Sequence, residues 1–166
     1  MKKYLVIGNP IDHSLSPELH NYWIKKNNIN ALYEKKKLNF NEIKNFIIDI
    51  KQKKIDGANV TVPFKKEVIP YLDKLTLDAK ATQSVNTILL TNDNKVFGHN
   101  TDISGFENAI KDTKYNLSGK KILILGSGGV TTSIILALYK MKVSNITLTN
   151  RTKTKAEYLQ NFYNNI

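Results

Sequence analysis

Two polar segments carry the side chains best suited to acid–base chemistry. Lys65 follows the apolar run that ends at Pro63, and α/β folds collect their ligands just past the carboxyl ends of such strands. In a partly desolvated site, the Lys65 ammonium can donate a proton to a reacting oxygen or accept one. The Asp102 carboxylate can accept a hydroxyl hydrogen bond and hold a nearby ammonium, or cap the helix that follows it. Taken alone, one lysine among 24 is more often a solvated surface residue.

Hydroxyl and amide side chains elsewhere could bind a small oxygen-rich ligand. Ser14 and Ser16 lie at a strand-to-helix turn, where converging backbone N–H groups suit a carboxylate. Alternatively, Ser14 is a turn residue and Ser16 only caps the helix that starts at Pro17. Asn86 offers both a donor and an acceptor to a sugar-like diol. These residue types favour a small hydroxylated acid as the ligand.

A glycine-rich turn indicates a nucleotide. Gly126-Ser127-Gly128-Gly129 follows the apolar run 121–125 and precedes a helical pattern, so its backbone can approach a pyrophosphate at a helix N-terminus. The next strand ends at Asn150-Arg151-Thr152, where NAD enzymes place an acidic residue for the ribose diol. The Arg151 guanidinium suits a 2′-phosphate instead. Because Arg151 is the only arginine in the chain, its place favours NADP over NAD.

Composition disfavours three other classes of protein. The net charge is +11, but the lysines are spread through every predicted helix, so we expect no nucleic-acid partner. His13, His20 and His99 lack metal-ligand spacing and there is no cysteine, so we expect no metal. No segment approaches the roughly 20 apolar residues of a membrane span, and the run 4–7 is too short for a signal peptide. We therefore expect a cytoplasmic protein.

Hydrophobic periodicity predicts the elements that position these residues. Strands are expected at 4–8, 32–38, 58–62, 121–125 and 145–149, and a hairpin at 85–90 and 95–98. Helices are expected at 16–28 (with Leu19, Trp23 and Ile24 buried), 41–50 (capped by Asn41, with Ile43, Phe46, Ile47 and Ile50 on its apolar face), 64–72 (interrupted by Pro70), 102–111, 130–141 and from 153 onward.

This pattern predicts an α/β fold: an N-terminal α/β substrate domain at 1–101, followed at 102–166 by the first half of a Rossmann-type NADP-binding domain. The strand–glycine turn–helix–strand order of the second part requires a parallel sheet. Two parallel strands cannot have both faces and both edges covered, so we expect either a fragment of a longer chain or a partner that completes it, and we favour a fragment.

Six motifs occur in the order and spacing of one family, and the chain resembles about the first three-fifths of a shikimate dehydrogenase. The motifs are Gly8-Asn9-Pro10 through Ser14-Leu15-Ser16-Pro17, Asn59 through Lys65, Val85-Asn86-Thr87, Asn100-Thr101-Asp102, Gly126 through Gly129, and Asn150-Arg151-Thr152. The resemblance implies NADPH-dependent, reversible reduction of 3-dehydroshikimate to shikimate in aromatic amino acid biosynthesis. One departure is Thr131, which stands where the family has glycine or alanine.

The resemblance also implies a role for each matched residue. The substrate carboxylate would be bound by Ser14 and Ser16, and the ring hydroxyls by Thr61, Asn86 and Asp102. Lys65 would be the acid/base group, with Asp102 beside it. The pyrophosphate would be held by Gly126, Ser127, Gly128, Gly129 and Val130, and the adenosine 2′-phosphate by Asn150, Arg151, Thr152 and Lys155.

Two alternatives to this reading stay open. One is a quinate/shikimate dehydrogenase that uses NAD, although Arg151 disfavours it. The other is a truncated, non-catalytic substrate-binding module, because the 166 residues alone are expected to show little or no activity. The active protein is expected to be a monomer or a homodimer.

Overall fold

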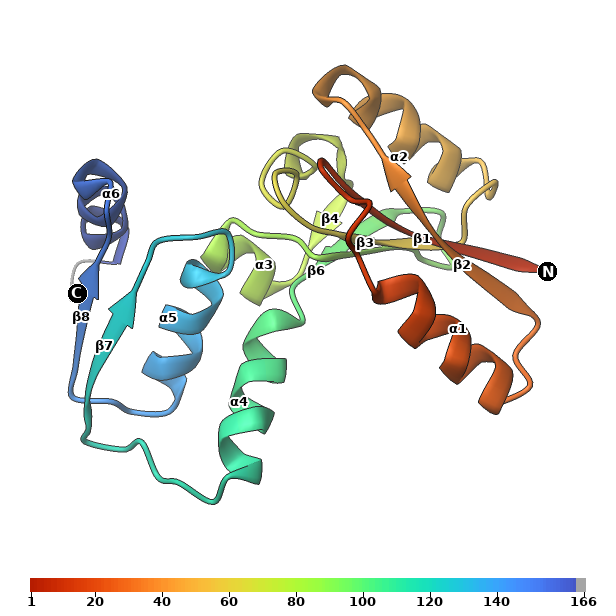
Figure 1. Cartoon of the computed structure of the whole chain (residues 1–166). Coiled ribbons are helices and arrows are strands. Elements are labelled where there is room, and N and C mark those ends of the chain that lie inside the picture. Colours follow the sequence, from red (N-terminus) through yellow and green to blue (C-terminus); the bar gives the residue numbers. More distant parts are fainter. Residues whose placement is uncertain (164–166) are drawn as a thin grey trace. The chain divides into compact units, whose positions relative to one another are not determined.

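The computed structural model describes residues 1–163 and divides into two compact units, Met1–Asn100 and Thr101–Ile166 (Figure 1). The division falls one residue before the boundary that the sequence predicts. Each unit has its own β-sheet and its own hydrophobic core. The predicted α/β fold class is confirmed.

The first unit contains a six-stranded mixed sheet in the order β2-β1-β3-β5-β6-β4. Strand β1 is parallel to both β2 and β3, whereas β5 is antiparallel to both β3 and β6. The elements in chain order are β1 (Lys2–Gly8), α1 (Ser16–Lys26), β2 (Ala31–Lys37), η1 (Phe40–Glu42), α2 (Ile43–Lys51), β3 (Gly57–Val60), η2 (Ile69–Tyr71), β4 (Lys74–Leu75), α3 (Leu77–Thr82), β5 (Thr87–Leu90) and β6 (Val96–His99).

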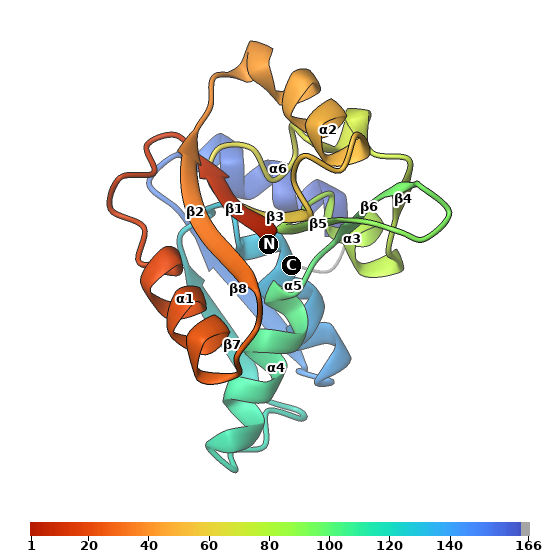
Figure 2. The same ribbon diagram turned by 90° about the vertical axis from the view of Figure 1, so that its right-hand side faces the viewer.

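Helices α1 and α2 cover opposite faces of this sheet (Figures 1 and 2). Alternate side chains of a strand point to opposite faces, and in β1 both sets are buried. Leu5 and Ile7 join the core that includes the apolar face of α2, while Val6 packs in a smaller cluster with Tyr33 and Ile24 of α1. A strand buried on both faces reads as a continuous apolar run, which is why the sequence identifies β1 clearly.

Three helix predictions need correction. Predicted helix 64–72 consists of turns and the short η2, because Pro70 removes a backbone donor. The second helix is preceded by η1, where the Asn39 N–H donates to the Glu42 carboxylate at 2.6 Å, so Asn41 is not its cap. Helix α1 buries none of its residues, and Leu19 and Trp23 are about half exposed. By contrast, Ile43, Phe46, Ile47 and Ile50 of α2 are buried as predicted.

Within the described residues, the second unit consists of a two-stranded parallel sheet and three helices. Its elements are α4 (Asp102–Asp112), β7 (Lys121–Leu125), α5 (Thr131–Lys140), β8 (Asn145–Thr149) and α6 (Lys153–Tyr163). Strands β7 and β8 have the bounds that the sequence predicts, and they pair in parallel. The core contains Ile122 and Ile146 from the strands together with side chains from α4, α5 and α6. The alternate residues Leu123 and Leu125 are 60% and 77% exposed, so the other face of β7 is uncovered.

Among residues 1–163, no helix combines the length and the apolar character that crossing a membrane requires.

Candidate functional site

The polar loops of the first unit meet at one end of its sheet. Strands β1 and β3 are parallel and neighbouring, so the loops that follow them start side by side. Strand β5 is antiparallel to β3, and β6 to β5, so the start of β5 and the end of β6 reach the same end of the sheet. The predicted substrate residues of this unit all lie there: Ser14 and Ser16 after β1, Thr61 and Lys65 after β3, and Asn86 before β5.

Backbone contacts hold these loops together. The Thr61 N–H donates to Ile7 O at 2.9 Å, and the Asn9 N–H donates to Val62 O at 3.1 Å. A β-carbon at Gly8 would lie only 2.7 Å from Thr61 Cγ2, so the close approach of the two loops depends on glycine at this position. The end of β1 and the start of the Thr61 loop therefore form one packed unit.

Ser14 and Ser16 are half-buried in the loop that leads into α1. The Ser14 hydroxyl accepts a hydrogen bond from the Ser16 N–H at 3.3 Å. The cap position of α1 is Leu15, and Ser16 is already helical, so the prediction that Ser16 caps this helix is wrong. The Ser14 hydroxyl, one residue before the cap position, still satisfies a backbone donor of the first turn. Carboxylate binding by the two serines stays a prediction.

Lys65 is half-buried, and its backbone carbonyl is bound by the segment that precedes β5. The Val85 N–H donates to Lys65 O at 2.8 Å, and the Asn86 N–H donates to His99 O at 3.1 Å. These bonds join the Lys65 loop to the segment before β5, and that segment to the end of β6. The sheet thus brings Lys65 and Asn86, 21 positions apart in the chain, into adjoining segments.

Asn86 belongs to a hydrogen-bonded group that the sequence analysis missed. Asn59 Nδ2 lies 3.2 Å from both Asn86 O and Thr87 Oγ1, and the Thr87 hydroxyl donates to Asn86 Oδ1 at 3.0 Å. The Tyr33 hydroxyl donates to Asn59 Oδ1 at 2.7 Å. One signal could have identified the group, because an asparagine between Ala58 and Val60 interrupts a buried apolar strand and buried polar groups require partners.

His20 stacks on the Tyr33 ring, with ring centroids 4.1 Å apart and an interplanar angle of 6°. Desolvation by burial raises the pKa of Tyr33 well above its ordinary value, so its hydroxyl stays protonated and remains a donor. Burial also lowers the pKa of His20, which favours the neutral imidazole against the ring. Tyr33 therefore packs against His20 and remains a neutral hydrogen-bond donor.

Asp102 is the first residue of α4, in the second unit, and it is half-buried. The cap position of this helix is Thr101, so Asp102 is not the cap, and its carboxylate lies in the first turn, where the helix dipole favours negative charge. Its pairing with Lys65 stays a prediction.

The glycine turn of the second unit is closed by three hydrogen bonds. The Gly126 N–H donates to Thr149 O at 2.7 Å, the Thr131 N–H to Gly128 O at 3.1 Å, and the Thr131 hydroxyl to Gly126 O at 3.3 Å. Gly126 has φ +104°, a region that side-chain-bearing residues rarely adopt. Thr131, which departs from the family pattern, therefore supports the turn through its hydroxyl.

The loop after β8 is tied to this turn by one side chain. Asn150 Oδ1 accepts from the Ser127 N–H at 3.1 Å, and Asn150 Nδ2 donates to Thr152 O at 2.7 Å. A pocket of about 450 Å³ opens here, and it is lined by Leu125, Gly126, Thr149, Asn150 and Arg151. The sequence predicted that the turn and the Arg151 loop serve one ligand, and the parallel pairing of β7 with β8 sets them side by side.

These groups fit a phosphate-bearing cofactor. Ser127 Oγ is buried, and it finds no hydrogen-bond partner within residues 1–163, although a buried hydroxyl normally has one. Arg151 is exposed at the pocket, where its guanidinium can pair with a phosphate. Lys155 is exposed in the first turn of α6. The 2′-phosphate role of Asn150, Arg151, Thr152 and Lys155 stays a prediction.

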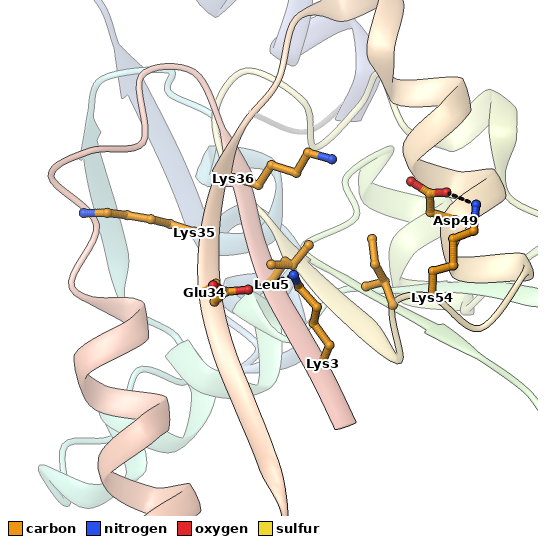
Figure 3. Close-up of a pocket in the computed structure, with 8 residues that line it drawn as sticks. Lys3, Leu5, Glu34, Lys35, Lys36, Asp49 and Lys54 are labelled. Atoms are coloured by element: carbon orange, nitrogen blue, oxygen red, sulfur yellow. Dashed lines mark hydrogen bonds and ion pairs between the residues drawn. The ribbon is translucent and has the colours of Figure 1, made fainter. Parts of the chain in front are cut away.

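Another pocket, of about 410 Å³, lies between β1, β2 and α2 (Figure 3). Two of its lysines are paired with its own carboxylates: Lys3 with Glu34 at 2.9 Å and Lys54 with Asp49 at 3.2 Å. The lining also includes Lys35 and Lys36, and it contains none of the residues that the sequence predicts for substrate binding. Within the described part of the chain, no group of three His, Asp or Glu side chains could hold a metal ion.

Comparison with known proteins gives two family matches. Residues 6–88 match the shikimate dehydrogenase substrate binding domain, and residues 107–166 match the shikimate / quinate 5-dehydrogenase model. A shikimate dehydrogenase (NADP(+)) of Pelagibacter ubique is 55% identical over 98% of this chain and 61% of its own length. One from Staphylococcus epidermidis is 40% identical over 92% of this chain and 56% of its own length.

Solved structures give the same result. Shikimate dehydrogenase from Aquifex aeolicus matches with a TM-score of 0.90 and 41% identity, covering 98% of this chain and 60% of that protein. Shikimate 5-dehydrogenase from Thermus thermophilus, solved with NADP(H) and shikimate, matches with a TM-score of 0.88 and 28% identity, covering 99% and 61%. The chain thus spans about three-fifths of the length of the relatives it matches.

Proposed function

This chain belongs to the shikimate dehydrogenase family, and on that premise we propose that it forms the substrate-binding unit and the first part of the NADP-binding unit of such an enzyme. The proposed reaction is the reversible, NADPH-dependent reduction of 3-dehydroshikimate to shikimate. The observation that carries the proposal is the meeting of the Ser14, Thr61, Lys65 and Asn86 segments at one end of the first sheet.

In this proposal the first unit binds and orients a hydroxylated acid. The Ser14 and Ser16 hydroxyls donate to its carboxylate, while Thr61 and Asn86 hold its ring hydroxyls. The Lys65 ammonium gives its proton to the alkoxide that forms when the ketone is reduced, and it takes the proton back in the reverse direction. Asp102 is proposed to bind a ring hydroxyl of the same substrate.

In the second unit, the backbone of the 126–130 turn is proposed to hold the pyrophosphate at the start of α5. Asn150, Arg151, Thr152 and Lys155 are proposed to bind the 2′-phosphate, and the pocket beside Arg151 supports this role. When bound, NADP exchanges a hydride with the substrate carbon. We further propose a cytoplasmic monomer or homodimer that needs no metal or nucleic acid.

The decisive test completes the chain with the C-terminal region of its Pelagibacter ubique relative and follows NADP reduction by shikimate spectrophotometrically. Lys65→Ala should lower kcat by about 10²–10⁴-fold, the usual contribution of a general acid or base. Lys66→Ala, at the exposed neighbouring lysine, is the matched control. Absence of turnover in the completed protein, or a Lys65→Ala variant as active as the control, would reject the proposal.

The same assay separates the remaining alternatives. Comparing NADP with NAD, and shikimate with quinate, tests the NAD-dependent quinate/shikimate reading, which Arg151 disfavours. The 166 residues alone are expected to show little or no turnover. If the completed protein also binds shikimate without turning it over, the non-catalytic binding module is the better description.

A further inference from the structure

Four side chains of the first unit form a continuous chain of hydrogen bonds that leads from the core to Asn86. The Tyr33 hydroxyl lies 2.7 Å from Asn59 Oδ1, Asn59 Nδ2 lies 3.2 Å from Thr87 Oγ1, and Thr87 Oγ1 lies 3.0 Å from Asn86 Oδ1. Tyr33 is 4% exposed and Asn86 is 9% exposed. Little water can reach these ends of the chain, so each polar atom depends on its protein partner.

A backbone carbonyl fixes the direction in which these bonds run. Asn86 O can only accept, so the Asn59 atom 3.2 Å from it must be the donor Nδ2. This places Asn59 Oδ1 at the Tyr33 hydroxyl, which donates to it. The orientation of the Asn59 amide thus follows from the chemistry of two partners on opposite sides of it.

The donor and acceptor roles of Thr87 and Asn86 follow in the same way. Thr87 Oγ1 accepts from Asn59 Nδ2, and its single hydroxyl proton is used in the bond that it donates to Asn86 Oδ1. In this bond the Asn86 atom that faces Thr87 is the acceptor Oδ1. The NH₂ half of the Asn86 amide is then directed away from Thr87.

We propose that Thr87 is a positioning residue that determines which half of the Asn86 amide faces the substrate. The inference rests on the proposed function, in which Asn86 binds a ring oxygen. A fixed N–H donor suits an oxygen that accepts, and both a hydroxyl and a ketone oxygen do so. A ligand with an ammonium group at that place, which can only donate, is disfavoured. Thr87 thereby contributes to selection of the substrate without touching it.

The first test measures the Asn86 amide in the ligand-free chain by NMR, with its NH₂ signals assigned by their loss in Asn86→Asp. In the wild type and in Thr87→Ser, which keeps the hydroxyl, only weak NOEs are expected between the Asn86 NH₂ protons and residue 87. In Thr87→Val, which is nearly isosteric and lacks the hydroxyl, the amide can turn over and these NOEs should strengthen. Thr87→Ala removes the hydroxyl with less bulk if the valine variant folds poorly.

Two further variants isolate the cause. Tyr33→Phe should leave the Asn86 amide unchanged, because Asn86 O still fixes Asn59. Thr147→Val, at an exposed threonine of β8, controls for the substitution itself. Strong NOEs from the Asn86 NH₂ protons to residue 87 in the wild type would overturn the inference, and so would a Thr87→Ser variant that behaves like Thr87→Val.

The second test titrates the same proteins with shikimate by calorimetry. Thr87→Val is expected to bind about tenfold more weakly, the loss of roughly one hydrogen bond, and Thr87→Ser within about threefold of the wild type. If the wild type binds and Thr87→Val binds equally well, the positioning role is wrong although the proposed function stands. If the wild type does not bind shikimate, the proposed function fails in this chain, and the NMR result still decides the orientation of Asn86.

Discussion

Replacing Gly8 by alanine should destabilise the first unit and disturb its substrate end. A β-carbon there would lie 2.7 Å from Thr61 Cγ2, 2.9 Å from Ile11 Cδ1 and 3.1 Å from Val62 O. Ordinary contacts of a β-carbon begin at 3.4 Å, so the two loops that flank Gly8 must shift apart. Overpacking of this kind costs about 1–3 kcal/mol.

Urea unfolding measures this cost, with the fluorescence of the only tryptophan, Trp23, reporting on the first unit. Because the urea dependence of unfolding for a small domain is about 1–3 kcal/mol per molar, the midpoint should fall by roughly 1 M. Displacement of Thr61 should also weaken shikimate binding in the fraction that remains folded.

The matched control is Gly105→Ala, within α4 of the second unit. A β-carbon at this glycine meets nothing within 4 Å, and alanine in a helix interior is favoured over glycine by about 0.5–1 kcal/mol. This variant should leave the tryptophan transition unchanged and stabilise the second unit, as followed by circular dichroism. A Gly8→Ala midpoint equal to or above that of the wild type would refute the steric reasoning.

Three further predictions concern single side chains. Asn100→Leu should destabilise the first unit by about 1–3 kcal/mol in urea unfolding, because the buried Asn100 amide donates two hydrogen bonds, to Thr82 and Ser84. A loss of stability below about 0.5 kcal/mol would contradict this prediction. Measured by calorimetry, Arg151→Gln should bind 2′,5′-ADP about tenfold or more weakly than the wild type and bind ADP nearly as well. An equal loss of affinity for both ligands would argue against a contact between Arg151 and the 2′-phosphate. Burial lowers the folded-state pKa of His20, so the contribution of this side chain to stability is present above the unfolded value of about 6.5 and is lost as pH falls through the lower folded value. His20→Gln should therefore reduce the slope of stability against pH below about 6.5. An unchanged slope would refute this assignment.

Local sequence was sufficient where a single strong signal determined the structure. Strands β7 and β8 were predicted with the bounds that the structure has, because an apolar run, a glycine turn and a helical pattern follow one another without competing signals. The residue types were not sufficient to predict the start of α1. Leu15 rather than Ser16 occupies the cap position of α1, and the Ser14 hydroxyl accepts from the Ser16 N–H of the first turn.

The burial of α1 shows a second limit of the sequence. Leu19 and Trp23 have the spacing of a buried helix face, but they are about half exposed. Apolar periodicity predicts that a face can be covered, whereas what covers it depends on which elements the fold places beside it. The same holds for Leu123 and Leu125 of β7, which lie on the open face of a two-stranded sheet.

The sequence by itself determined the α/β class, the glycine turn and the identity of the polar residues, since these depend on residue type and on short spacings. Only the tertiary structure decided that Lys65, Asn86 and the serine loop share one end of a sheet, because that requires β5 to run antiparallel to β3. It also decided the direction of the bonds from Tyr33 to Asn86. The donor and acceptor roles of a polar side chain depend on which partners lie within hydrogen-bonding distance. Here those partners come from strands that are distant in sequence.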